Sequence, residues 1–198
     1  MSTTPLFDQT PVDSAPANRR AAGARPLVIG LDLSLTCTGV AGADWTDHIR
    51  TKLRGDARLG YLEAHVASFI KAADLVVMEG PSFGHAGPRF HEDLAGLRVL
   101  VRRYCWRQGI PYAVIPPSNL KLYATGHGNA AKGEVRSAVA DRYGVHTEGA
   151  ARYDEADALT AAAAGLHWLG YPLAPVPERN ASALDGCAWP EHPPVVAR

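Results

Sequence analysis

The sequence predicts an α/β protein with a mixed five-stranded sheet, antiparallel in its first strands and parallel afterwards, flanked by helices. Two neighbouring apolar runs, 27–35 and 37–43, are joined through a single threonine, which is typical of antiparallel strands in a hairpin. Later in the chain, apolar stripes at helical spacing alternate with short apolar runs, which is typical of parallel strands connected by helices. Together these patterns indicate a mixed sheet with helices on its faces.

The N-terminal half is expected to contain three strands, a helix and a fourth strand. After the first two runs, residues 48–53 can add a third strand to the hairpin. Apolar residues then recur at helical spacing from Leu59 to Ile70. The following run, Leu75–Glu79, is short and apolar and precedes a Gly-Pro pair, as expected for a buried strand.

The C-terminal half is expected to contain a helix, a strand and two helical segments. An apolar stripe from Phe90 to Tyr104 predicts the helix. Residues Tyr112–Ile115 predict a strand that stops at Pro116, because proline cannot donate to a sheet ladder. The two helical segments follow, and an alanine-rich helix begins near Asp154.

One domain, 27–170, is expected between two irregular ends. The length of 198 residues and the 46% hydrophobic content allow one well-filled core. Residues 1–26 hold four of the fifteen prolines without apolar periodicity and are interpreted as a disordered arm. Residues 171–198 hold six more and are interpreted as a proline-rich tail, although the region of Trp189 could dock on the domain or on a partner.

Charge and cysteine content narrow the class of protein. The formal net charge is zero, but residues 84–136 carry eight basic side chains against three acidic ones, which fits either a nucleic-acid contact or a solvated helix face. Three cysteines without C-x-x-C spacing argue against a disulfide framework and a zinc site, and fit the cytoplasm. The longest weakly polar stretch, 158–169, is shorter than the roughly 20 residues that span a bilayer, so no membrane association is expected.

Four carboxylates are the candidate metal ligands. Asp32 lies in the first apolar run, and Glu79 ends the run before the Gly-Pro turn, at the sheet edge where α/β proteins place their sites. Asp154 and Asp157 are three residues apart near the start of a helix, so they face the same way, with Glu155 turned away.

Clustered acids repel one another unless cations are shared among them. Their hard oxygen ligands favour Mg²⁺ or Mn²⁺, and divalent ions at such a site indicate phosphodiester chemistry. The alternatives are an incidental acid at Asp32 and, for Asp154 and Glu155, acids that complement the helix dipole.

A glycine-punctuated segment between helical stretches is the candidate phosphate contact. Lys121 and Lys132 flank Gly126 and Gly128, so the segment offers two ammonium groups and free backbone N–H groups to phosphates. The intervening His127 is interpreted as a hydrogen-bonding loop residue rather than a ligand.

In four motifs the chain resembles the RuvC family of Holliday junction resolvases, within the RNase H-like (retroviral integrase) superfamily. The motifs are D-L-S-L-T-x-T-G from Asp32, the strand-ending Glu79, K-x(4)-G-x-G-x-A-x-K from Lys121 to Lys132, and D-x-A-D-A-L from Asp154. They occur in the family's order and cover about residues 27–169. The residues after Glu79, Gly80 and Pro81, depart from the family pattern.

The resemblance implies a two-fold homodimer that nicks symmetric strands of a four-way junction and leaves 5′-phosphate ends. It implies that the four acids bind two Mg²⁺ ions, for which Mn²⁺ can substitute, with Lys121 near the cleaved strand and Lys132 acting in catalysis. It also places Phe83 near the position of an aromatic that wedges into the junction core; the alternative is an aromatic side chain folded back onto the protein core. The arginines of the predicted helix over 90–104 either hold DNA backbone or lie at the dimer contact: Arg98, Arg102 and Arg103.

Three other functions remain open from the sequence. One is a nuclease of the same superfamily that acts on other branched DNA or on RNA/DNA hybrids. Another is a junction-binding protein that does not cleave, which the presence of all four acids disfavours. A kinase-like phosphate loop around Asp32 is the third, and the short chain argues against it.

Overall fold

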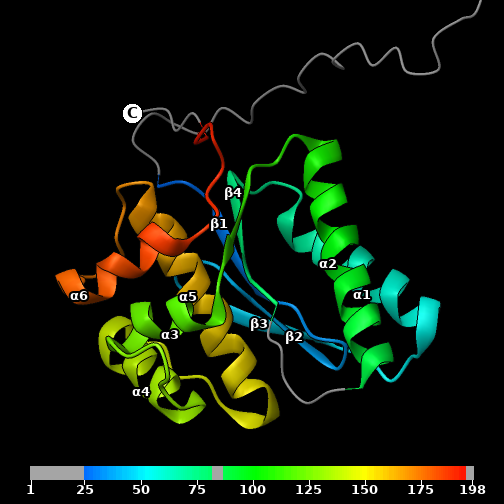
Figure 1. Cartoon of the computed structure of the whole chain (residues 1–198), viewed down its shortest axis with the longest axis horizontal. Coiled ribbons are helices and arrows are strands. Elements are labelled where there is room, and N and C mark those ends of the chain that lie inside the picture. The colour runs from blue at the N-terminus through cyan, green and yellow to red at the C-terminus, as the bar shows by residue number, and fades with distance from the viewer. Residues whose placement is uncertain (1–24, 82–86, 195–198) are drawn as a thin grey trace, which may run out of the picture.

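A five-stranded mixed sheet forms the centre of the molecule in a computed structural model, which describes residues 25–81 and 87–194. The strands are β1 (Val28–Asp32), β2 (Cys37–Ala41), β3 (Thr46–Arg50), β4 (Leu75–Glu79) and β5 (Tyr112–Ile115). Their order across the sheet is β3-β2-β1-β4-β5 (Figure 1). The pairs among β1, β2 and β3 are antiparallel, and β4 pairs in parallel with both β1 and β5, which confirms the predicted sheet.

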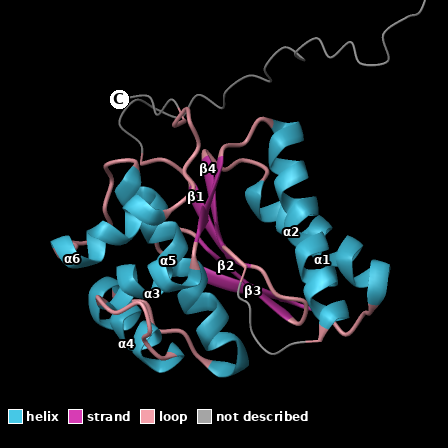
Figure 2. Cartoon of the chain, in the orientation of Figure 1, coloured by secondary structure: helices cyan, strands magenta, loops and turns pink. Residues whose placement is uncertain are grey.

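Helices cover both faces of this sheet (Figure 2). On one face lie α1 (Gly55–Ile70) and α2 (Pro88–Gln108), and on the other lie α3 (Pro117–Thr125), α4 (Lys132–Tyr143) and α5 (Arg152–Trp168). The helical stretches predicted after β5, on either side of the glycine-punctuated segment and from near Asp154, correspond to α3, α4 and α5. Left-handed glycines end two of these helices, Gly126 after α3 and Gly144 after α4.

The helix α5 lies close against the sheet because both surfaces carry small residues. A Cβ atom at Gly30 of β1 would overlap the carbonyl oxygen of Ala158, and one at Gly39 of β2 would overlap that of Asp154. Further along, Gly165 faces Val77 and Val28. The first turn of α5 therefore sits at the end of the sheet where β1 finishes, and its last turns lie where β1 begins.

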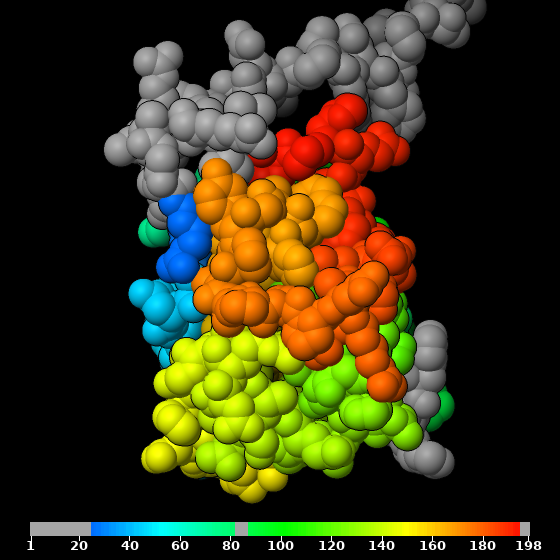
Figure 3. Space-filling model, turned by 90° about the vertical axis from the view of Figure 1, so that its left-hand side faces the viewer, coloured from blue at the N-terminus to red at the C-terminus, as the bar shows by residue number. Residues whose placement is uncertain are grey.

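Residues 171–194, which the sequence analysis treats as a tail, pack on the domain over much of their length. The short helix α6 (Glu178–Ala181) and the 3-10 turn Ser182–Gly186 lie against α3, and Figure 3 shows the segment in orange to red next to the green and yellow helices. Backbone hydrogen bonds of 3.0 and 3.1 Å join Ala188 to Val114 of β5. The Trp189 ring stacks on Trp168 with centroids 4.8 Å apart, so this region docks on the body.

Three further expectations concern the N-terminal arm, the cysteines and membrane association. Of the predicted arm 1–26, residues 1–24 lie outside the described residues. All three cysteines are free thiols. In the described ranges, no helix is both long and apolar enough to cross a membrane.

Candidate metal centre

Three of the predicted acids meet at the carboxyl edge of the sheet. Because β1 and β4 are adjacent and parallel, with Leu31 opposite Met78, their final residues Asp32 and Glu79 lie side by side. The third acid, Asp157, comes from α5 where that helix crosses the edge. One carboxylate oxygen from each of the three residues lies within 4.8 Å of the others. This spacing allows a single cation to contact all three.

Burial makes this group of charges energetically unfavourable without a cation. Desolvation raises the pKa of Asp32 well above its ordinary value, and the neighbouring Glu79 and Asp154 charges add to the effect. Desolvation followed by the Asp32 charge raises the pKa of Asp157 to about 7. The pKa of Glu79 is also raised, again mainly by burial. Burial therefore favours the protonated form of each acid, and a bound cation would favour the ionised form.

Both predicted lysines lie on the α3 and α4 side of these acids. Lys132, the first residue of α4, lowers the pKa of each of the three acids through its charge. Lys121 of α3 has the same effect on Asp157. The backbone N–H of Ala131 donates to Glu134 Oε2 over 2.6 Å, which fixes the start of α4 beside the acids.

The fourth predicted acid, Asp154, lies at the margin of the centre rather than within it. It precedes Asp157 by one helical turn, and its charge contributes to the raised pKa values of Asp32 and Asp157. It also neighbours the Cys37 thiol of β2. Burial and this carboxylate together raise the pKa of Cys37 to about 12, so the thiol stays protonated and can donate to Asp154.

Glu155 has a structural role that the sequence analysis did not anticipate. It is only 9% exposed, and its two carboxylate oxygens are engaged by side chains of the edge strand β3. His48 Nδ1 lies 2.7 Å from Oε1, and the Thr46 hydroxyl donates to Oε2 over 3.0 Å. These contacts tie the N-terminal end of α5, which carries Asp154 and Asp157, to the edge strand β3.

The α2 arginines do not form one surface. Arg98 lies near the acids: its Nη2 donates to the Gly80 carbonyl over 3.3 Å, directly after Glu79. Burial lowers the pKa of Arg98, and the Glu79 and Asp32 charges oppose that shift. Arg102 instead donates from Nε to the Tyr112 hydroxyl at 3.3 Å and lies over the same ring. Arg103 is exposed on the helix, and Phe83 lies outside the described residues.

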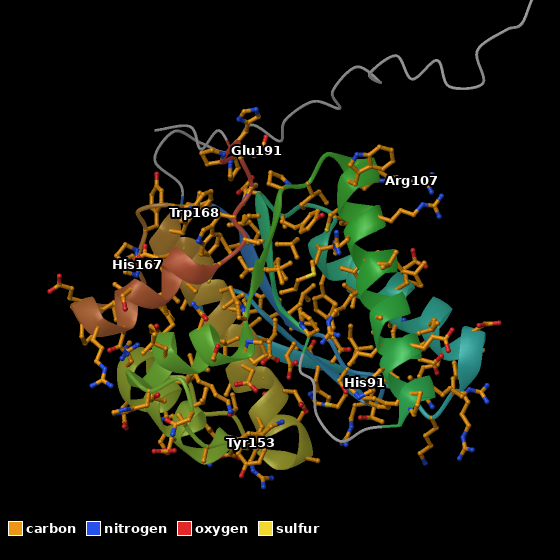
Figure 4. The ribbon with its side chains drawn as sticks, viewed as in Figure 1. His91, Arg107, Tyr153, His167, Trp168 and Glu191 are labelled. Carbon is orange, nitrogen blue, oxygen red and sulfur yellow. The ribbon has the colours of Figure 1, made fainter. Side chains whose placement is uncertain are left out.

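The ends of α2 and α5 near the acids lie at the same end of the molecule. Figure 4 shows this through His91, in the first turns of α2, and Tyr153, which precedes Asp154 in α5. Tyr153 packs under the Arg152 guanidinium, whose carbon lies 4.5 Å from the ring centroid.

The comparisons with known proteins agree with this arrangement at the level of the fold. No family model matches the sequence, and no curated protein matches it. Among solved structures, it is similar to Thermus thermophilus RuvC in complex with a Holliday junction substrate, with 22% identity and a TM-score of 0.61 over 77% of this chain and 99% of that one. The chain has the RuvC fold.

A second RuvC structure from Thermus thermophilus gives a similar result, with 22% identity and a TM-score of 0.59 over 76% of this chain and 99% of that chain. Nearly the whole RuvC chain thus has a counterpart here. The mixed five-stranded sheet with helices on both faces and the similarity to RuvC together confirm the predicted RNase H-like fold.

Proposed function

We propose that the protein is a metal-dependent endonuclease that resolves four-way DNA junctions by paired nicks. The observation that carries the proposal is the group of three acids, the buried Asp32 and Asp157 and the partly buried Glu79, with oxygens within 4.8 Å of one another. They lie at the carboxyl edge of a sheet in a RuvC fold, and one of the similar RuvC structures contains a Holliday junction substrate. Symmetric nicks require two sites, so we expect a homodimer, which sedimentation of the purified protein would test.

The residues at the centre fit Mg²⁺, and Mn²⁺ as its substitute. All three acids supply hard oxygen donors, and their raised pKa values reflect a negative cluster that a divalent ion would stabilise. Asp154 provides a fourth carboxylate next to them. When bound, a pair of such ions supplies Lewis-acid stabilisation of the phosphate and of the attacking and leaving oxygens.

Positively charged side chains of the protein contribute to the reaction in addition to the metal ions. Lys132 is close enough to the acids to lower their pKa values, so its ammonium group can offset negative charge that develops on the phosphate. In this proposal Lys121, on the preceding helix, holds the same DNA strand, and its charge already acts on Asp157. Arg98 holds the turn that follows Glu79 and thereby keeps that carboxylate at the edge of the sheet.

The decisive experiment compares nicking of a labelled mobile four-way junction with nicking of a matched linear duplex. Wild type and Asp32→Asn are assayed with Mg²⁺ and with EDTA. Symmetric, Mg²⁺-dependent cuts in the junction alone, absent from the variant, are the expected result. Equal cutting of both substrates would instead assign a broader branched-DNA or hybrid nuclease. Binding of the junction without cleavage by wild type would assign a non-cleaving junction protein.

A further inference from the structure

A second concentration of positive charge lies on the opposite side of the acids from the lysines. Between residues 50 and 58 the chain carries four basic residues and a single acid, Asp56. This segment links the end of β3 to the start of α1. Since β3 runs antiparallel to β2, and β2 antiparallel to β1, the end of β3 lies at the same edge of the sheet as Asp32.

Two of these basic residues join an arginine of α2 around a hollow. The cavity has a volume of about 360 Å³ and lies between the first turns of α1 and α2, which pack together on the sheet. We name it the arginine hollow. Its lining is formed by Leu35, Arg54, Gly55, Arg58, Arg89, Phe90 and Asp93. Leu35 lies three residues after Asp32, in the stretch of chain that leads from β1 to β2.

The three guanidinium groups are available to a ligand. Within residues 25–81 and 87–194, none of them takes part in an ion pair, although Asp93 lines the same cavity. Arg58 donates its Nε to the Leu53 carbonyl over 2.8 Å, a contact that fixes the side chain at the start of α1. Arg54 and Arg89 are exposed. Three arginines that line one cavity favour an anion whose oxygens accept paired hydrogen bonds, and phosphate has that geometry.

We propose that the arginine hollow binds a phosphodiester of the DNA strand on the α1 and α2 side of the metal centre. The inference rests on the proposed function, since it makes the acids the midpoint of a longer DNA contact. Lys121 and Lys132 hold the backbone on the α3 and α4 side, and the arginine hollow holds it on the other. Phe90 is 39% exposed at the rim, where an aromatic side chain can pack against a sugar or base.

The salt dependence of junction binding tests this assignment. Arg54→Ala and Arg89→Ala, alone and together, remove exposed charges without removing a hydrogen bond of the described structure. Fluorescence anisotropy in EDTA, from 50 to 200 mM NaCl, measures the slope of log K against log salt. Each variant is expected to weaken binding and to reduce the magnitude of that slope by about one unit, and the double variant by about two.

Two further variants make the test specific to the hollow. Lys71→Ala removes one positive charge from the other end of α1 and is expected to leave the slope unchanged. Asp93→Asn removes the acid in the lining and is expected to tighten binding. Unchanged slopes in the arginine variants would overturn the proposal, and so would an equal loss in Lys71→Ala, which would show that only the overall charge matters.

Failure of the proposed function gives a different result. If wild type cuts the junction with Mg²⁺ while the arginine variants bind like wild type, the nuclease assignment stands and the arginine hollow is not a DNA site. If wild type neither binds nor cuts the junction, the proposed function itself fails. A thermal melt of each variant in EDTA confirms that the comparison is between folded proteins.

Discussion

Asp157→Asn should stabilise the metal-free protein while abolishing its affinity for divalent ions. Asparagine keeps the shape of the side chain and removes one charge from the buried cluster. The pKa of Asp157 rises from its ordinary value of 3.8 to about 7, because burial and the Asp32 charge disfavour the carboxylate. Since one pKa unit corresponds to about 1.4 kcal/mol, ionised Asp157 destabilises the fold by about 4 kcal/mol at pH 8.

The effect has a definite sign and pH window. Because the pKa of Asp157 is higher in the folded state than in the unfolded state, folding takes up a proton at this residue. The stabilisation that this protonation gives is complete below about pH 4 and is lost as the pH rises through 7. The metal-free wild type should therefore become less stable from pH 4 to pH 8. The advantage of Asp157→Asn should be about 4 kcal/mol at pH 8 and about 2 kcal/mol at pH 5.

Urea unfolding in EDTA at pH 5 and pH 8 measures these differences, with Asp44→Asn as a control for an exposed aspartate. Addition of Mn²⁺ at about 100 times its dissociation constant should stabilise wild type by about 2.7 kcal/mol at pH 8 and leave Asp157→Asn unaffected. An equal gain from the substitution at both pH values, or no gain at either, would refute the reasoning that the cluster is strained by charge.

Three other substitutions test separate parts of the site. Lys132→Ala should slow single-turnover cleavage more than it weakens junction binding by anisotropy; an equal loss in both would make the lysine only an anchor. Glu155→Ala should lower the free energy of unfolding by about 1–3 kcal/mol, because it removes the hydrogen bonds that His48 and Thr46 make to its buried carboxylate, and an unchanged urea midpoint would contradict this. Gly39→Ala should displace the first turn of α5, costing about 1–3 kcal/mol and reducing Mn²⁺ affinity in a titration, whereas Gly60→Ala, which has open space around it, should do neither.

The sheet could be predicted from the sequence because its central strands are buried on both faces. The run Leu75–Glu79 is a strand with the same bounds in the structure, since burial on both sides requires continuous apolar residues. Residues 171–194 were harder to interpret. Their prolines indicate an irregular chain, and the chain is irregular, but apolar side chains such as Val176 and Trp189 still pack on the domain. The apolar residues that pack in this way follow neither helical nor strand spacing, so the sequence pattern does not reveal them.

The metal centre was partly predictable for a topological reason. Acids at the ends of adjacent parallel strands must meet at one edge, so Asp32 and Glu79 come together whenever the strand order is right. The partners of Glu155 depend on the register of β3, more than 100 residues away in the chain. Likewise, Arg54 and Arg89 approach one another only because α1 packs on α2, and no local pattern connects them.

The charges of the site explain why DNA binding and cleavage should separate. In their ionised form the three carboxylates repel a phosphate, so without metal the protein must hold DNA through the cations on either side of the cluster. Removing one acid, as in Asp32→Asn, lowers that repulsion and leaves Lys132 and the arginine hollow in place. The variant should therefore bind the junction in EDTA at least as tightly as wild type, although it has lost a ligand for the ions that cleavage requires.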